Sequence, residues 1–365
     1  MNIEFHYYMT YLIAARAGFS SEEARTLAYS SQYIDDNDII YNISQNSSDN
    51  YSNYISQTKN ITKPKKKLFR IYPIFHFIPG EPTADSARRK DGKLHLLNTT
   101  PDSKNAREIL KLALKSDNLY KIGLAVHSFA DTFAHQNFVG YYDEFNIVKD
   151  IQKKLNSLLN NSPYEIGHAA AKHRPDIPNL IWEDPRLCDS HSLRDNKKIF
   201  LKAAGRIFKE LKLYQEPDLK KHDLKREKKE LKRDLAKAIG SSSCNPNLFN
   251  TNTKDQRLER YKKLALREEY GGVELKDYQI SEWFNEVIKV DFRFMKIDNS
   301  SPWQRLFLDL LSSHLKIFKN SYSWKIEKYK ESHWYKFQQA VRELQEEALQ
   351  VLNPLVFDKL ELENW

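Results

Sequence analysis

The sequence predicts an all-α protein, in which a multi-helix bundle is followed by an additional helical C-terminal half. Three observations predict this class. Most of the 365-residue chain divides into stretches whose apolar residues recur at helical spacing. Helix-end and helix-start signals flank several of them, such as Gly18 after the first stretch and Ser20 with Glu23 before the second. The stretch from Tyr120 to Asn137 is apolar on nearly all sides, which is typical of a helix inside a protein.

The first two helices are expected at residues 5–18 and 20–36. A polar loop is expected at 41–62 and an irregular buried segment at 68–81, where two prolines interrupt an apolar run. Residues 219–237 consist mainly of charged side chains with three spaced leucines, which predicts an exposed helix on a thin apolar stripe. The other expected helices span 101–115, 120–137, 150–159, 193–214, 255–269, 277–290, 302–318 and 333–351.

Composition is that of a globular protein, with 40% hydrophobic and 12% aromatic residues. Its two cysteines, Cys188 and Cys244, form no CxxC motif, so neither a disulfide framework nor a thiolate zinc site is expected. The N-terminus lacks a signal-peptide pattern and no apolar run reaches about 18 residues, which favours a cytoplasmic protein without a transmembrane segment. Export without such a signal stays open. The net charge of +9 favours an anionic partner or substrate.

The strongest chemical signal lies in the central apolar helix. His127, Asp131 and His135 stand four residues apart, so all three project from one helix face and their donor atoms can converge. Imidazole and carboxylate together suit a divalent metal such as zinc. The alternative is a hydrogen-bonded network in the core, because buried polar groups must be satisfied in one way or the other.

Further candidate ligands lie in the first half of the chain, each beside apolar or small residues. They are His6, Asp35, His76 and His168. One shared metal site explains this distribution most simply. We therefore expect a metal-binding helical core at residues 1–176. Residues 177–365 form a helical C-terminal half, either a separate region or a continuation of the same domain.

The order and spacing of these residues resemble a known superfamily. Gln32-Tyr-Ile-Asp35, Phe75-His76-Phe-Ile and His127-x-x-x-Asp131 follow one another as in the zinc-dependent phospholipase C and S1/P1 nuclease superfamily. His6 near the N-terminus, His135 and Gly167-His168 complete the resemblance, which covers roughly residues 1–176. The N-terminal part is also similar to an uncharacterised bacterial family that shares the His-Tyr-Tyr start and the Gln-Tyr-x-Asp-Asp stretch.

The superfamily resemblance implies an all-helical fold that holds two or three zinc ions. Its ligands would be His6, Asp35, His76, His127, Asp131, His135 and His168. Met1 would take the place of the superfamily's N-terminal ligand. Lys172 stands where the superfamily has a carboxylate, so Glu165 or Asp176 would supply that ligand, or the third metal is absent.

The implied function is a metal-dependent phosphate-ester hydrolase, a phosphodiesterase of phospholipase C-like or P1 nuclease-like type. Asp35 would orient or deprotonate the attacking water, and Asp131 would bridge two ions. The substrate stays open between a phospholipid, a nucleic acid and a small diester, and so does the identity of a protein partner. The alternative is a non-catalytic protein with a structural metal site and a basic C-terminal half that binds a partner.

Overall fold

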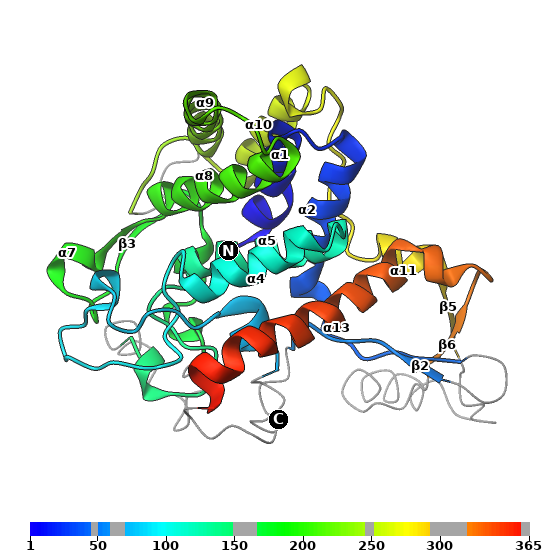
Figure 1. The fold of residues 1–365 in the computed structure, drawn as a ribbon, viewed down its shortest axis with the longest axis horizontal. Helices are drawn as coiled ribbons and strands as arrows, with labels where there is room; N and C mark the ends of the chain where they lie inside the picture. The colour runs from blue at the N-terminus through cyan, green and yellow to red at the C-terminus, as the bar shows by residue number, and fades with distance from the viewer. Residues whose placement is uncertain (45–49, 59–69, 149–165, 245–251, 293–319, 359–365) are drawn as a thin grey trace, which may run out of the picture. The chain divides into compact units, whose positions relative to one another are not determined.

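The computed structural model describes residues 1–44, 50–58, 70–148, 166–244, 252–292 and 320–358. The chain forms two compact units. Unit 1 comprises residues 1–38, 56–278 and 340–365, and unit 2 comprises residues 39–55 and 279–339. The protein is predominantly helical, which confirms the predicted fold class (Figure 1). The units do not divide at residue 176, because residues 177–278 belong to the same unit as the N-terminal region.

Unit 1 consists mainly of helices. Its elements are η1 (Glu4–Met9), α1 (Thr10–Ala17), α2 (Ser21–Asp36), η2 (Tyr72–His76), η3 (Asp85–Ala87), α4 (Lys104–Lys115), α5 (Leu119–Ala134), η4 (Glu144–Asn146), η6 (Ala169–Ala171), η7 (Arg174–Asp176), β3 (Ile181–Glu183), α7 (Asp189–Ser192), β4 (Leu193–Asp195), α8 (Asn196–Gln215), α9 (Lys221–Ile239), α10 (Lys254–Ala265), η8 (Glu268–Tyr270) and η10 (Asn353–Phe357). Among the helices that the structure describes, none combines the length and apolar character needed to cross a lipid bilayer.

Local signals set the first two helices as expected. Gly18 ends α1 in a left-handed conformation with φ 112°, which a glycine adopts without steric cost. Ser20 and Glu23 then form a capping box that starts α2. The first turn differs from the prediction, because Glu4–Met9 is a π-helix that continues directly into α1. Both helices are largely buried along their length.

Helix α5 forms the centre of unit 1 and packs against α2, α4 and α8 (Figure 1). Asn118 caps its start by accepting hydrogen bonds from the backbone amides of Tyr120 and Lys121. Gly123 lets α2 approach closely, since a Cβ there would lie 2.4 Å from the Leu27 carbonyl oxygen. All residues from Lys121 to Ala134 are buried, as the apolar sequence predicts. Side chains on α5 that point toward α2 are therefore removed from water.

The charged helix of the C-terminal half is α9. Its leucines Leu224, Leu231 and Leu235 are buried, which confirms the predicted thin apolar stripe. Helix α9 packs against α8 and also contacts α10. Helix α8 begins at Asn196, three residues later than predicted. Leu193–Asp195 is strand β4 instead and pairs antiparallel with β3.

Unit 2 contains a β-sheet that the sequence patterns did not predict. Its elements are β1 (Asn42–Ser44), β2 (Asn50–Ser52), α11 (Glu282–Val287), β5 (Ile288–Phe292), β6 (Asn320–Trp324), η9 (Tyr329–Glu331) and the start of α13 (His333–Leu352), which continues into unit 1. The strand order is β2-β1-β6-β5, with Ile43 paired to Tyr51 on β2 and to Tyr322 on β6. Strands therefore replace parts of the loop predicted at 41–62 and of the helix predicted at 277–290. Strand β1 pairs with β6 far along the chain, and a local pattern cannot reveal such a partner.

Three further predictions include residues outside those that the structure describes. The segment predicted to be irregular at 68–81 contains the π-helical turn η2, with Pro73 in its first turn. Residues 68 and 69 lie outside the described residues, as do the helices predicted at 150–159 and 302–318.

Candidate metal centre

The seven predicted ligands converge inside unit 1. They come from η1 (His6), the end of α2 (Asp35), the end of η2 (His76), α5 (His127 and Asp131), its C-cap (His135) and the residue before η6 (His168). The donor atoms form three groups, and within each group they lie within 4.8 Å of one another: His6, His127 and Asp131; Asp35, His76 and His127; His135, His168 and Asp176. The sequence prediction of one shared site thus has a geometric counterpart.

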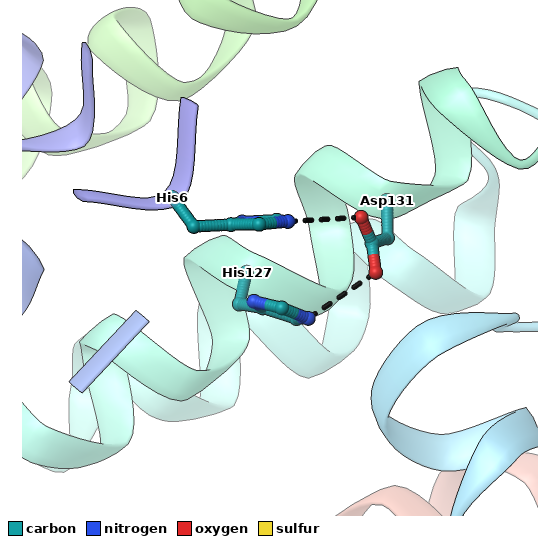
Figure 2. Close-up of side chains that lie close together, drawn as sticks. All are labelled: His6, His127 and Asp131. Carbon is teal, nitrogen blue, oxygen red and sulfur yellow. Dashed lines mark ion pairs between the residues drawn. The ribbon is translucent and has the colours of Figure 1, made fainter. Parts of the chain in front are cut away.

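Asp131 stands at the middle of the cluster and is 1% exposed. Its Oδ1 accepts a hydrogen bond from the Met1 amine and lies 3.2 Å from His6 Nε2. Its Oδ2 lies 3.2 Å from His127 Nε2 and 3.4 Å from His76 Nδ1. Figure 2 shows the His6 and His127 rings stacked and directed toward the two different oxygens of this carboxylate. Asp131 is therefore placed to contact two cations at once.

Asp35 closes the second group from the end of α2. Its Oδ1 is 3.6 Å from His76 Nδ1 and 3.7 Å from His127 Nε2. Those two ring nitrogens are themselves 3.2 Å apart. The Asp35 side chain is 28% exposed, whereas both imidazoles are buried. This carboxylate is thus a ligand candidate that solvent also reaches.

Asp176 completes the third group. Its Oδ1 lies 3.3 Å from His135 Nε2, and its Oδ2 lies 3.6 Å from His168 Nε2. The Met1 nitrogen is 3.2 Å from His135 Nε2 and 3.5 Å from Asp176 Oδ1, so it joins this group to Asp131. Between the two carboxylates that the sequence left open, Asp176 lies in the cluster, and Glu165 falls outside the described residues.

Each of four imidazoles is fixed in its orientation by a backbone carbonyl. His127 Nδ1 lies 2.6 Å from the Ser31 oxygen, and His76 Nε2 lies 3.1 Å from the Ser56 oxygen. His135 Nδ1 and His168 Nδ1 lie 2.9 Å from the carbonyl oxygens of His76 and Lys172. A carbonyl only accepts, so each of these ring nitrogens carries the proton. In the neutral rings the opposite nitrogen is then an unprotonated acceptor that faces the cluster.

Burial favours the neutral form of His6, His127 and His135. Desolvation lowers the pKa of His127 and of His135 to about 4, and it lowers the pKa of His6 well below its usual value. Burial acts upward on the pKa of Asp131, but His135, the Met1 amine and other neighbours outweigh it and hold that pKa well below normal. Burial and the nearby Asp131 charge raise the pKa of Asp35 well above normal. Asp131 therefore loses its proton at a lower pH than Asp35 does.

His6 differs from the other histidines of the cluster. Neither of its ring nitrogens makes a hydrogen bond to any described residue, although Nε2 lies close to Asp131. A fully buried imidazole without a hydrogen-bond partner is costly unless something else satisfies it. A cation between His6 Nε2 and Asp131 Oδ1 would satisfy both groups.

Acid should destabilise the metal-free protein. A histidine whose folded-state pKa is about 4, against 6.5 when unfolded, is protonated preferentially in the unfolded state as the pH falls through this window. His127, His135 and His6 act in this direction, whereas the raised pKa of Asp35 acts in the opposite one. We expect the unfolding temperature of chelator-treated protein to fall between pH 6.5 and 4, as measured by circular dichroism. A constant or rising unfolding temperature over this range would contradict the assigned neutral rings.

Lys172 should be dispensable for metal binding. Its side chain is exposed, its backbone carbonyl rather than its side chain contacts His168, and Asp176 already lies beside that imidazole. The variant Lys172→Glu is therefore expected to keep the metal content of the wild type, measured by elemental analysis after dialysis. An increase of one ion per chain would show instead that a carboxylate is missing at this position.

The groups that orient the ligand side chains were not predicted from the sequence. The carbonyls of Ser31 and Ser56 leave no signal in a sequence, since every residue has a carbonyl. Glu4 could have been noticed as a carboxylate two residues before His6 in an otherwise apolar run. It is fully buried and paired with Arg257.

The fold and this cluster define a predominantly helical protein with a buried site of histidines, aspartates and a terminal amine. The chain belongs to the family of unknown function DUF6765, which matches residues 1–352. No curated protein and no solved structure matches the chain. The resemblance to the phospholipase C and P1 nuclease superfamily stays a prediction from the sequence motifs.

Proposed function

We propose that this protein is a metal-dependent hydrolase of phosphate esters that uses two or three divalent ions, with zinc as the expected metal. The observation that carries the proposal is the pair of unprotonated nitrogens His76 Nδ1 and His127 Nε2. They lie 3.2 Å from each other and face the oxygens of Asp35 and Asp131. When Asp35 is ionised, four acceptors point at one another, and a cation between them would remove their repulsion.

The donor atoms divide naturally among three ions. One ion would be held by Asp35, His76, His127 and Asp131 Oδ2, and a second by His135, His168 and Asp176. A third would take the Met1 amine, His6 and Asp131 Oδ1. Nitrogen and carboxylate donors without thiolates are typical of zinc in enzymes, and carbonyl-bound imidazoles are the usual support of such ligands.

Partial exposure of the cluster favours catalysis over a structural role. A structural zinc ion is closed off by four protein ligands, whereas a catalytic one keeps a position for water. The side chains of Asp35 and His168 are 28% and 22% exposed, while His6 and His127 are fully buried. Solvent and a substrate phosphate would therefore reach the cluster at Asp35 and at His168.

The chain's own residues would divide the work of phosphate-ester hydrolysis. When bound, the ions supply Lewis acidity toward the phosphoryl oxygens and lower the pKa of a water from about 15.7 to about 7. Asp35, whose side chain is partly exposed to solvent, would orient the attacking water and accept its proton. Asp131, buried and held ionised, would keep the donor groups together.

The proposal is tested by metal content and chelator-sensitive activity together. Protein grown with ample zinc should carry two to three ions per chain, because three donor groups are present. It should hydrolyse a generic phosphodiester, single-stranded nucleic acid or a phospholipid, lose this activity with chelator, and regain it with zinc. His95→Ala serves as the control, since His95 pairs with Asp143 outside the cluster. Metal content at background levels, or a map of anomalous scattering with every ion closed by protein ligands alone, would refute it.

A further inference from the structure

A buried ion pair connects η1, which carries His6, to α10 in the C-terminal half. Glu4 lies two residues before His6 on η1, and its carboxylate accepts two hydrogen bonds of 2.8 Å from Nε and Nη2 of Arg257 on α10. The two side chains are 0% and 6% exposed. The third nitrogen of Arg257, Nη1, donates to the Asn252 carbonyl at 2.7 Å, which fixes the guanidinium from its other side.

Two tyrosines extend this connection along the same segment. Tyr7 donates its hydroxyl to the Lys276 carbonyl at 2.9 Å, and Tyr8 donates to Asp277 Oδ1 at 2.6 Å. Asp277 in turn pairs with Lys262 on α10 at 2.8 Å. Residues from 252 to 277 thus hold both ends of η1, at Glu4 and at the two tyrosines.

These contacts of η1 help to position His6, which makes no hydrogen bond to any described residue. The other four imidazoles of the cluster are oriented by backbone carbonyls, whereas neither nitrogen of His6 is bonded to a described residue. Its ring is therefore placed by the backbone of η1, by stacking on His127 and by the 3.2 Å contact with Asp131. A buried ion pair is weak evidence for stability in itself, since desolvation offsets most of its attraction. Its geometric consequence is that the N-terminal donors are held beside Asp131.

We infer that Arg257 is a positioning residue, which holds the Met1 amine and His6 in place for a cation through its pair with Glu4. The inference rests on the proposed metal centre and gives the C-terminal half a part in it. Loss of such an outer contact typically weakens metal affinity about 10- to 100-fold. The ion next to His6 and Met1 should be affected, and the ions at the other two groups should not.

The test compares two matched arginine variants in the full-length protein. Arg257→Lys keeps the charge but loses the two-point contact with Glu4. Arg186→Lys does the same to the pair of Arg186 with Asp184, which is equally buried, has contacts of 2.9 and 2.7 Å, and touches none of the candidate ligands among the described residues. Zinc affinities are measured by titration against a competing chelator. Arg257→Lys should weaken one ion about 10- to 100-fold, and Arg186→Lys should weaken none.

Hydrogen exchange of the peptide at residues 1–9, measured in chelator, provides a readout that needs no metal. Exchange should increase in Arg257→Lys and stay unchanged in Arg186→Lys. If the wild type binds no zinc, the proposed function fails, and the exchange experiment still decides on the positioning role. Unchanged exchange and zinc affinity in Arg257→Lys, or equal changes in both variants, would overturn the inference. Should Arg257→Lys not fold, Glu4→Gln removes the same ion pair with almost no change in side-chain shape, and the same results are expected.

Discussion

Replacing Asp131 with alanine is expected to release most of the bound metal and to lower the thermal stability of the protein. Asp131 contacts the Met1 amine, His6, His76 and His127 at its two oxygens, so its removal would take one ligand from two of the three proposed ions. Cations left in a buried site without this charge are poorly compensated. Breaking a buried ion pair by removing one partner typically costs about 3–5 kcal/mol. Metal binding and folding are coupled, so both losses should appear together.

Elemental analysis and thermal unfolding with and without zinc measure this effect. The control is Asp184→Ala, which removes an equally buried carboxylate whose partner is Arg186 rather than a candidate ligand. Asp184→Ala should lower stability to a similar extent and keep the wild-type metal content. Wild-type metal content in Asp131→Ala would exclude Asp131 as a bridging ligand.

Replacing Asp35 with asparagine should separate catalysis from metal binding. The change is nearly isosteric, and His76, His127 and Asp131 remain to hold the adjacent ion, so most of the metal and the fold should persist. The amide can neither accept the proton of the attacking water nor raise its reactivity. Turnover of a phosphodiester that the wild type cleaves should fall about 100-fold or more, the usual contribution of a positioned acid or base.

The neighbouring Asp36→Asn is the matched control for Asp35→Asn. Asp36 hydrogen-bonds to Gln32 and Tyr278 and belongs to none of the three donor groups. Its variant should keep wild-type turnover. Full activity in Asp35→Asn would show that another group activates the water. If Asp35→Asn instead loses metal and stability as strongly as Asp131→Ala, Asp35 is a ligand alone.

The sequence by itself determined the helical class and the core of the site. Helix boundaries near Gly18 and Ser20 follow from local conformational and capping preferences, which act over a few residues. His127 and Asp131 must lie on the same helix face because four residues make about one helical turn. Imidazoles and carboxylates also stand out within apolar stretches, so the sequence is enough to name the seven candidate ligands.

Tertiary structure alone decided how these residues meet. Asp35, His76 and His168 reach α5 from separate segments, and their distances depend on how whole helices pack. The same packing brings Asp176 to His168 and leaves Lys172 at the surface. Strand β1 pairs with β6, which lies nearly 280 residues later in the chain, and no local pattern predicts this pairing. Glu4 and Arg257 meet for the same reason: contacts between distant segments are set by the packed core, and local sequence patterns carry no record of them.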